Sequence, residues 1–138
     1  MQYEGSCHCG AIGFSYRTAI PPEDWSVRAC QCSFCRAHAT VSVSDPGGSL
    51  AFRVGDRDAL QRYRFGQRTA DFLLCKHCGV YIGAVIASAK GSFGIINARV
   101  LISLDAPLPE PVAKTYEGEQ IDDRVERRLE RWTPVIQV

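Results

Sequence analysis

Short runs in which apolar and polar residues alternate recur through the first hundred positions of the chain. In AIGFSY, at 11–16, the alternation puts Ile12, Phe14 and Tyr16 on one face, as in a half-buried β-strand. Similar runs, rich in β-branched and aromatic residues, follow at 40–43, 50–54, 60–65, 70–75, 80–87 and 93–97. Turn-forming residues separate them, for example SDPGG at 44–48. The pattern therefore predicts a mainly β fold of short strands.

The pattern changes after DAPLPEP at 105–111. Apolar residues are then spaced by four, four and three positions, which places them on one helical face: Ile121, Val125, Leu129 and Trp132. We expect one C-terminal amphipathic helix within 118–133, ended by Pro134. The other positions carry acidic residues first and basic residues later, as the helix dipole favours. Because acids and bases are interleaved, we interpret the arginines of this helix as an ordinary solvated face rather than a nucleic-acid or membrane contact.

The length and charge of the chain narrow the classes of function. With 138 residues, of which 46% are hydrophobic, the chain is predicted to fold as a single domain over 1–138. Sixteen basic residues balance fifteen acidic ones, so a nucleic-acid partner is not favoured. The N-terminus lacks the pattern of a signal peptide, and no apolar run approaches the ~20 residues of a membrane span. We therefore expect a soluble, cytoplasmic protein with no membrane association.

The seven cysteines fall into three motifs: CHC at 7–9, CQCSFC at 30–35 and CKHC at 75–78. An odd number cannot pair completely as disulfides, and in a reducing compartment such spacings indicate metal ligands. The first and third motifs together supply the ligands of a closed, structural zinc site: Cys7, Cys9, Cys75 and Cys78. A glycine follows each of these two motifs, Gly10 after CHC and Gly79 after CKHC, which suits a tight turn. The alternative is four reduced cysteines that pack as small hydrophobic side chains.

The middle motif leaves three thiols on one loop: Cys30, Cys32 and Cys35. Catalytic zinc typically keeps three protein ligands and one position for water or substrate, so we predict a second, open and catalytic zinc site there. His38 is the alternative fourth ligand, which would make this a second structural site. We do not expect His8 or His77 to be ligands. Three thiolates lower the Lewis acidity of zinc, which disfavours hydrolysis and favours activation of another soft ligand such as a thiol.

The ordered motifs GSCHCGAI, CQCSFCR and CKHCGVYIG resemble the glutathione-dependent formaldehyde-activating enzyme family, which includes domains of the centromere protein V type. The resemblance covers residues 5 to about 100 and leaves the helix after 118 outside. It implies a β-tent-like fold of coiled, short antiparallel sheets held together by two zinc ions per chain. By this resemblance the four-cysteine site is structural, and Cys30, Cys32 and Cys35 are the catalytic ligands.

The activity that the resemblance implies is the joining of glutathione and formaldehyde to S-hydroxymethylglutathione, classed as a carbon–sulfur lyase from the reverse direction. The sequence departs from the usual family pattern at Gln31 and at AHATV, 37–41. These departures lie at the substrate end, so another small aldehyde or thiol is an open alternative. A non-enzymatic zinc-binding module and a thiol or redox sensor are the other two. A homodimer is also left open.

Glutathione carries two carboxylates, so arginines and lysines near the cysteine motifs are candidate anchors. The candidates are Arg28, Arg36, Lys76, Arg64 and Arg68. Among them Arg36 is the preferred glutathione contact because it follows Cys35 directly. For the other four, a solvated surface position is the favoured interpretation.

Overall fold

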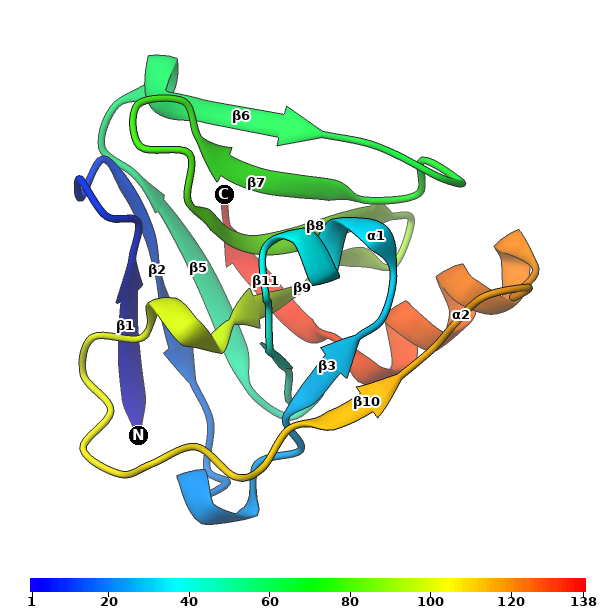
Figure 1. The fold of residues 1–138 in the computed structure, drawn as a ribbon, viewed down its shortest axis with the longest axis horizontal. Coiled ribbons are helices and arrows are strands. Elements are labelled where there is room, and N and C mark those ends of the chain that lie inside the picture. Colours follow the sequence, from blue (N-terminus) through cyan, green and yellow to red (C-terminus); the bar gives the residue numbers. More distant parts are fainter.

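Strands dominate the computed structural model, which describes residues 1–138 (Figure 1). The strands are β1 (Gln2–Ser6), β2 (Ile12–Arg17), β3 (Arg28–Cys30), β4 (Ser42–Val43), β5 (Ser49–Val54), β6 (Leu60–Tyr63), β7 (Asp71–Cys75), β8 (Tyr81–Ser88), β9 (Gly91–Asn97), β10 (Val112–Lys114) and β11 (Thr133–Gln137). The helices are α1 (Ser33–Ala37) and α2 (Ile121–Arg131), and 3₁₀ turns occupy Pro22–Asp24, Arg57–Ala59 and Ala98–Val100. The predicted mainly β fold is confirmed.

The eleven strands form one hydrogen-bonded system that branches at β9. On one side β9 pairs with β8, which continues through β7 to β6 as an antiparallel meander. Its other partners are β11, which leads to β5, β2 and β1, and β4, which leads to β3 and β10. Figure 1 shows β6 and β7 lying across one end of the β1–β2–β5 layer. The sheet is not closed, and its short antiparallel strands agree with the predicted architecture except at two parallel pairs, β3–β10 and β5–β11.

Most predicted strands are present with shifted ends. The run at 11–16 forms β2, whereas the run at 40–43 gives only the two residues of β4. Three further strands, β1, β3 and β10, were not predicted. QYEGS has one large apolar side chain on its buried face, and RAC and VAK are too short to show a period.

The C-terminal strand β11 was also not predicted, and it lies inside the sheet between β5 and β9. Pro134 normally argues against an interior strand because it cannot donate to the ladder. Here it is the second residue of β11, opposite Phe93, and the register shifts between Val135 and Gln137. The helix before it ends at Arg131, as the position of Pro134 led us to expect.

The core consists of two hydrophobic clusters. The larger one fills the space between the sheet layers around Phe14 and Phe52, whose rings are 6.5 Å apart. The second contains Phe72, Tyr81 and Trp132, and Val125 and Leu129 of α2 pack against it. The predicted apolar face of the C-terminal helix is confirmed at Val125, at Leu129 and at Trp132, which caps α2. Its first position differs, since Ile121 stays 48% exposed at the start of the helix.

Candidate metal centres and active-site cavity

Cysteines from opposite ends of the sheet meet in the first candidate metal centre. Cys7 and Cys9 lie in the turn between β1 and β2, Cys75 ends β7, and Cys78 lies in the turn before β8. Their four Sγ atoms lie within 4.8 Å of one another. The Cys9 Sγ is 3.8 Å from that of Cys7 and 3.6 Å from that of Cys75. Sulfurs bound at about 2.3 Å to one tetrahedral zinc ion are about 3.8 Å apart, so these two separations are compatible with zinc.

The two turns that carry these cysteines have the same backbone feature, a glycine with positive φ directly after the second cysteine. Gly10 and Gly79 follow the second cysteine of each pair with φ of +85° and +78°, a conformation that strains other residues. Their amides donate back to the carbonyl oxygens of Cys7 and Cys75 at 3.2 and 2.8 Å. The Ile12 amide also donates to the Cys7 Sγ at 3.4 Å. The tight turns that the CG endings predicted are therefore present, and they aim the thiols inward.

The second candidate centre is built by β3 and α1. Cys30 ends β3, Cys32 is the N-cap of α1, and Cys35 lies one turn further on. Their Sγ atoms also lie within 4.8 Å of one another, with Cys35 buried and the other two partly exposed. The Cys32 Sγ accepts a hydrogen bond from the Cys35 amide at 3.4 Å. Hydrogen bonds from the Cys30 and Cys35 thiols lower the pKa of Cys32, and hydrogen bonds within the group raise the pKa of Cys30 and of Cys35.

No histidine belongs to the three-cysteine group. His38 is the C-cap of α1, and its ring stacks against Phe34 with 4.5 Å between ring centres. The second group that could hold a metal ion consists of the three cysteines alone, which argues against the alternative site with three cysteines and one histidine. His8 and His77 are exposed, and His77 lies 3.3 Å from the Asp56 carboxylate. Neither is part of a cysteine group that could hold a metal ion.

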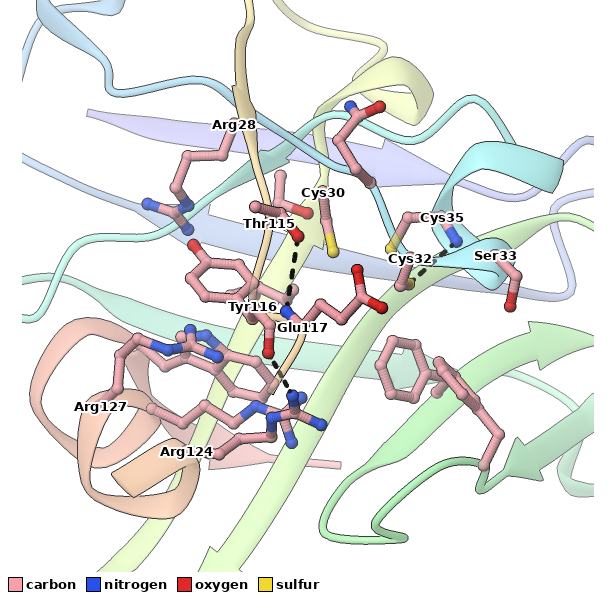
Figure 2. A pocket seen from close by; sticks show the side chains of 17 residues that line it. Arg28, Cys30, Cys32, Ser33, Cys35, Thr115, Tyr116, Glu117, Arg124 and Arg127 are labelled. Atoms are coloured by element: carbon pink, nitrogen blue, oxygen red, sulfur yellow. Dashed lines mark hydrogen bonds between the residues drawn. The ribbon is translucent and has the colours of Figure 1, made fainter. Parts of the chain in front are cut away.

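A cavity of about 400 Å³ adjoins the three-cysteine group (Figure 2). One part of its lining is thiol, from Cys30, Cys32 and Cys35. A second part is apolar, from Phe65, Phe72, Ile95 and Trp132. A third part is cationic, from Arg28, Arg124, Arg127 and Arg128. The volume lies within the range typical of small-molecule sites, and the mixture of apolar walls with a few charged groups is typical of them too.

The prediction that the α2 arginines form a solvated face is wrong for three of them. Arg124, Arg127 and Arg128 line the cavity, and the side chains of Arg124 and Arg127 are only 19% and 20% exposed. Arg124, Arg128 and Trp132 follow one another at intervals of four residues and so share a helical face. Because that face docks on the second core cluster, the arginine stems cover apolar surface while their charged ends reach the cavity.

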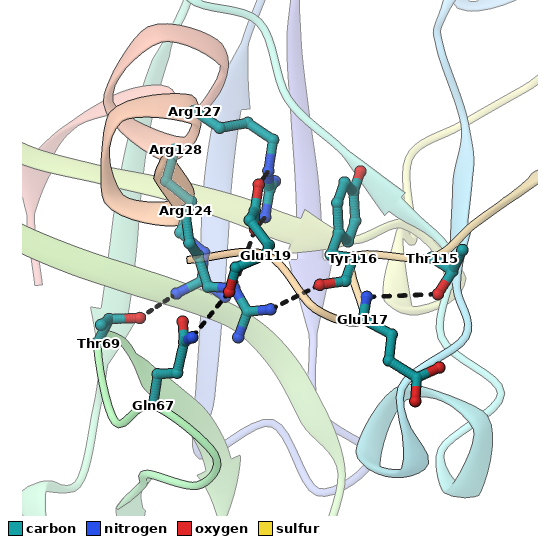
Figure 3. A network of polar contacts seen from close by, with 9 residues as sticks. All are labelled: Gln67, Thr69, Thr115, Tyr116, Glu117, Glu119, Arg124, Arg127 and Arg128. Atoms are coloured by element: carbon teal, nitrogen blue, oxygen red, sulfur yellow. Dashed lines mark hydrogen bonds and ion pairs between the residues drawn. The ribbon is translucent and has the colours of Figure 1, made fainter. Parts of the chain in front are cut away.

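A polar network holds the segment between β10 and α2 against this helix (Figure 3). The Glu119 carboxylate accepts hydrogen bonds from Arg124 at 3.0 Å and from Arg127 at 2.9 and 3.1 Å. Arg124 also donates to the Tyr116 carbonyl oxygen, and the Arg127 guanidinium lies 3.7 Å from the centre of the Tyr116 ring. The hydrogen bond from Arg127 lowers the pKa of Glu119. Tyr116 and Glu117 are thereby fixed as part of the cavity wall.

The arginines and lysine named as glutathione anchors lie in different places. Arg28 lines the cavity. Arg36, the preferred anchor, is exposed and does not line the cavity. The same is true of Lys76 and Arg68. Arg64 pairs with Asp71 on the surface. Sequence reasoning therefore found one cavity arginine and missed three, because adjacency to a cysteine in the chain does not fix the direction of a side chain.

The family model of the glutathione-dependent formaldehyde-activating enzymes matches residues 2–118. The chain belongs to this family. The family match includes every cysteine of both metal-binding groups and ends just before α2, so the three arginines of α2 lie beyond it.

Two individual proteins are similar to this chain. A Halomonas elongata protein, provisionally named as a glutathione-dependent formaldehyde-activating enzyme, is 39% identical over 61 residues. These residues are 44% of this chain and 33% of that relative, so the chain spans about a third of the relative's length. The crystal structure of a Rhodobacter sphaeroides protein superposes with a TM-score of 0.58 and 26% identity. That superposition covers 80% of this chain and 99% of the other. No helix of the chain has the length and apolar character needed to cross a bilayer.

Proposed function

We propose that this protein adds the thiol of glutathione to formaldehyde or another small aldehyde, with the reverse cleavage placing it among carbon–sulfur lyases. The observation that carries the proposal is the meeting of three thiols and a cationic wall in one cavity. Three cysteines favour a soft ligand such as a thiolate, and the arginines favour an anionic one. Glutathione combines both features in one small molecule, and the family is defined by its use of glutathione.

We further propose that both cysteine groups hold zinc, one ion in each. Cys7, Cys9, Cys75 and Cys78 would hold a structural ion, and Cys30, Cys32 and Cys35 a catalytic one. When bound at the three-cysteine group, zinc supplies a position for a further thiolate and lowers the pKa of that thiol. Zinc is also the metal that four thiolates at these separations fit.

The remaining work falls to the cavity residues. Figure 2 shows the Glu117 carboxylate directed toward the side of the cavity that carries Cys32. In the proposed reaction, Glu117 takes the thiol proton, the sulfur forms a bond to the carbonyl carbon, and the carbonyl oxygen receives the proton. Atoms and charge then balance without a further reactant. The apolar walls exclude water, which would otherwise hydrate the aldehyde, and the arginines orient the thiol.

The exchange of formaldehyde with glutathione, followed by NMR line broadening, tests this proposal. Thiols add to formaldehyde unaided, so the quantity to measure is the acceleration that the zinc-loaded protein gives over buffer. Because Glu117 is the proposed base, we expect Glu117→Gln to lower this acceleration roughly 100-fold and to leave the zinc content unchanged. If the unaltered protein gives no acceleration with any small aldehyde, the enzyme proposal is rejected. Zinc release on mild oxidation, in that case, would favour a redox-sensing module.

A further inference from the structure

Two of the four cavity arginines lack a carboxylate partner within the protein. Arg28 donates one hydrogen bond, to the Ser44 hydroxyl at 2.8 Å. Arg128 donates one, to the Thr69 hydroxyl at 2.6 Å, and its guanidinium lies 4.9 Å from the centre of the Trp132 ring. By contrast, Arg124 and Arg127 both pair with Glu119. Two of the cavity cations therefore share one carboxylate, and the other two have none within salt-bridge distance.

The two unpaired guanidinium groups sit in surroundings that disfavour a charge. Burial lowers the pKa of Arg28, and burial lowers the pKa of Arg128 to about 10. The Nε of Arg128 is buried and has no hydrogen-bond acceptor. Charged groups withdrawn from water are normally paired, because an unpaired one costs several kcal/mol in solvation. Apart from the bond to Thr69, the guanidinium of Arg128 has no acceptor within the chain, and the side chain lines the cavity, which points to a ligand that supplies one to its terminal nitrogens.

The two arginines approach the three-cysteine group from different elements. Arg28 and Cys30 are two residues apart on β3, so both side chains project from the same face of that strand. Arg128 comes from α2, which forms the other side of the cavity. A ligand whose sulfur lies at the cysteines therefore meets one unpaired cation from the strand and a second from the helix.

We propose that Arg28 and Arg128 are two carboxylate-binding positions that make the cavity specific for a thiol with two carboxylates. This inference rests on the proposed function and assigns the two residues by which the cavity would distinguish a thiol with two carboxylates from other thiols. Each guanidinium binds one carboxylate of the substrate through its terminal nitrogens. Because α2 lies beyond the residues matched by the family model, this chain acquires half of its thiol specificity from its own C-terminal helix.

A series of thiols on the unaltered, zinc-loaded protein tests the inference without any substitution. The probes are glutathione, its two monoethyl esters, its diethyl ester and 2-mercaptoethanol, and their dissociation constants come from titration calorimetry. Each esterification removes one charge-assisted pair, so we expect affinity to fall roughly tenfold per ester. Equal affinities for glutathione and its diester would overturn the inference and leave the proposed function intact. Failure of every thiol to bind would overturn both.

Substitutions then assign the carboxylates to the arginines. Arg28→Gln and Arg128→Gln should each weaken glutathione binding roughly tenfold and leave 2-mercaptoethanol binding unchanged. Each variant should also be insensitive to esterification of one carboxylate while remaining sensitive to the other. Arg131→Gln is the matched control, because Arg131 is exposed on the same helix and does not line the cavity. If esterification still weakens binding by the same factor in both variants, the carboxylates bind elsewhere and the assignment is wrong.

Discussion

The backbone amide of Cys35 donates a hydrogen bond to the sulfur of Cys32, 3.4 Å away, at the point where α1 begins. One residue thus serves both as the cap of a helix and as a member of the candidate metal centre. The local backbone arrangement and the position of the thiols therefore depend on each other, and a substitution can separate the two roles if it keeps the cap.

Cys32→Ser is such a substitution, since serine is a good N-cap and a poor ligand for zinc. We expect the variant to keep its fold and its four-cysteine zinc, while the zinc of the three-cysteine group and the acceleration of aldehyde exchange are lost. Metal content by atomic spectroscopy and the midpoint of thermal unfolding provide the measurements. Full activity with a single zinc per chain would be inconsistent with catalysis at this group.

Cys75→Ser should behave in the opposite manner, because Cys75 is 1% exposed and its group joins the β1–β2 turn to the β7–β8 turn. Structural zinc in small domains contributes about 10 kcal/mol of binding free energy to the folded state. We therefore expect a chain that is largely unfolded or aggregated at 37 °C. A near-native circular dichroism spectrum and melting curve would show that this group is not structural.

Several features of this site were visible in the sequence and others were not. The spacings in CHCG and CKHCG carry enough information to predict the four-cysteine group, since each motif fixes two ligands on one turn. The cavity could not be predicted in this way, because residues far apart in the chain, such as Arg28 and Arg128, line it together. Nothing in the alternation of acids and bases along α2 distinguishes Arg128, which is partly buried, from Arg131, which is exposed. Only the docking of α2 through Trp132 decides which arginines face inward.

The strand β2 was predictable because its large apolar residues repeat every second position, and β7 and β8 because each is a short apolar run bounded by turn residues. The position of β11 between β5 and β9 was not, because long-range pairing leaves no trace in a five-residue segment that contains proline.

Glu119→Gln should reduce stability in a way that depends on pH. Hydrogen bonds from Arg127 and Arg124 lower the pKa of Glu119 in the folded protein, so its contribution is complete above the unfolded pKa of about 4.3 and is lost as pH falls through the lower folded value. We expect the variant to be less stable by about 1 kcal/mol at pH 7, and the difference to shrink below about pH 4. Urea unfolding at several pH values measures it, with Glu117→Gln as the control. A difference that is constant from pH 3 to pH 7 would contradict the ionic role of Glu119.

Tyr81→Phe should stabilise the protein. The Tyr81 hydroxyl is buried without a hydrogen-bond partner, and burial raises its pKa well above the usual value, so it stays neutral. Removing an unsatisfied buried hydroxyl relieves a desolvation penalty of about 1–3 kcal/mol. The ring keeps its stacking against Phe72. Denaturant unfolding measures the change, and Tyr63→Phe, at a 44% exposed position, is the control with no expected effect. A loss of stability would mean that the hydroxyl has a partner in solution.

The proposed function requires two zinc sites that differ in accessibility. One would be enclosed by four cysteines, and the other would be held by three cysteines that line a cavity. The most direct measurement is a zinc count on the purified protein before and after incubation with a mild chelator. The account predicts two zinc ions per chain, of which one is lost readily and is protected by glutathione, while the other stays bound until the chain unfolds. A single tightly held zinc, or two ions that leave together regardless of glutathione, would contradict it.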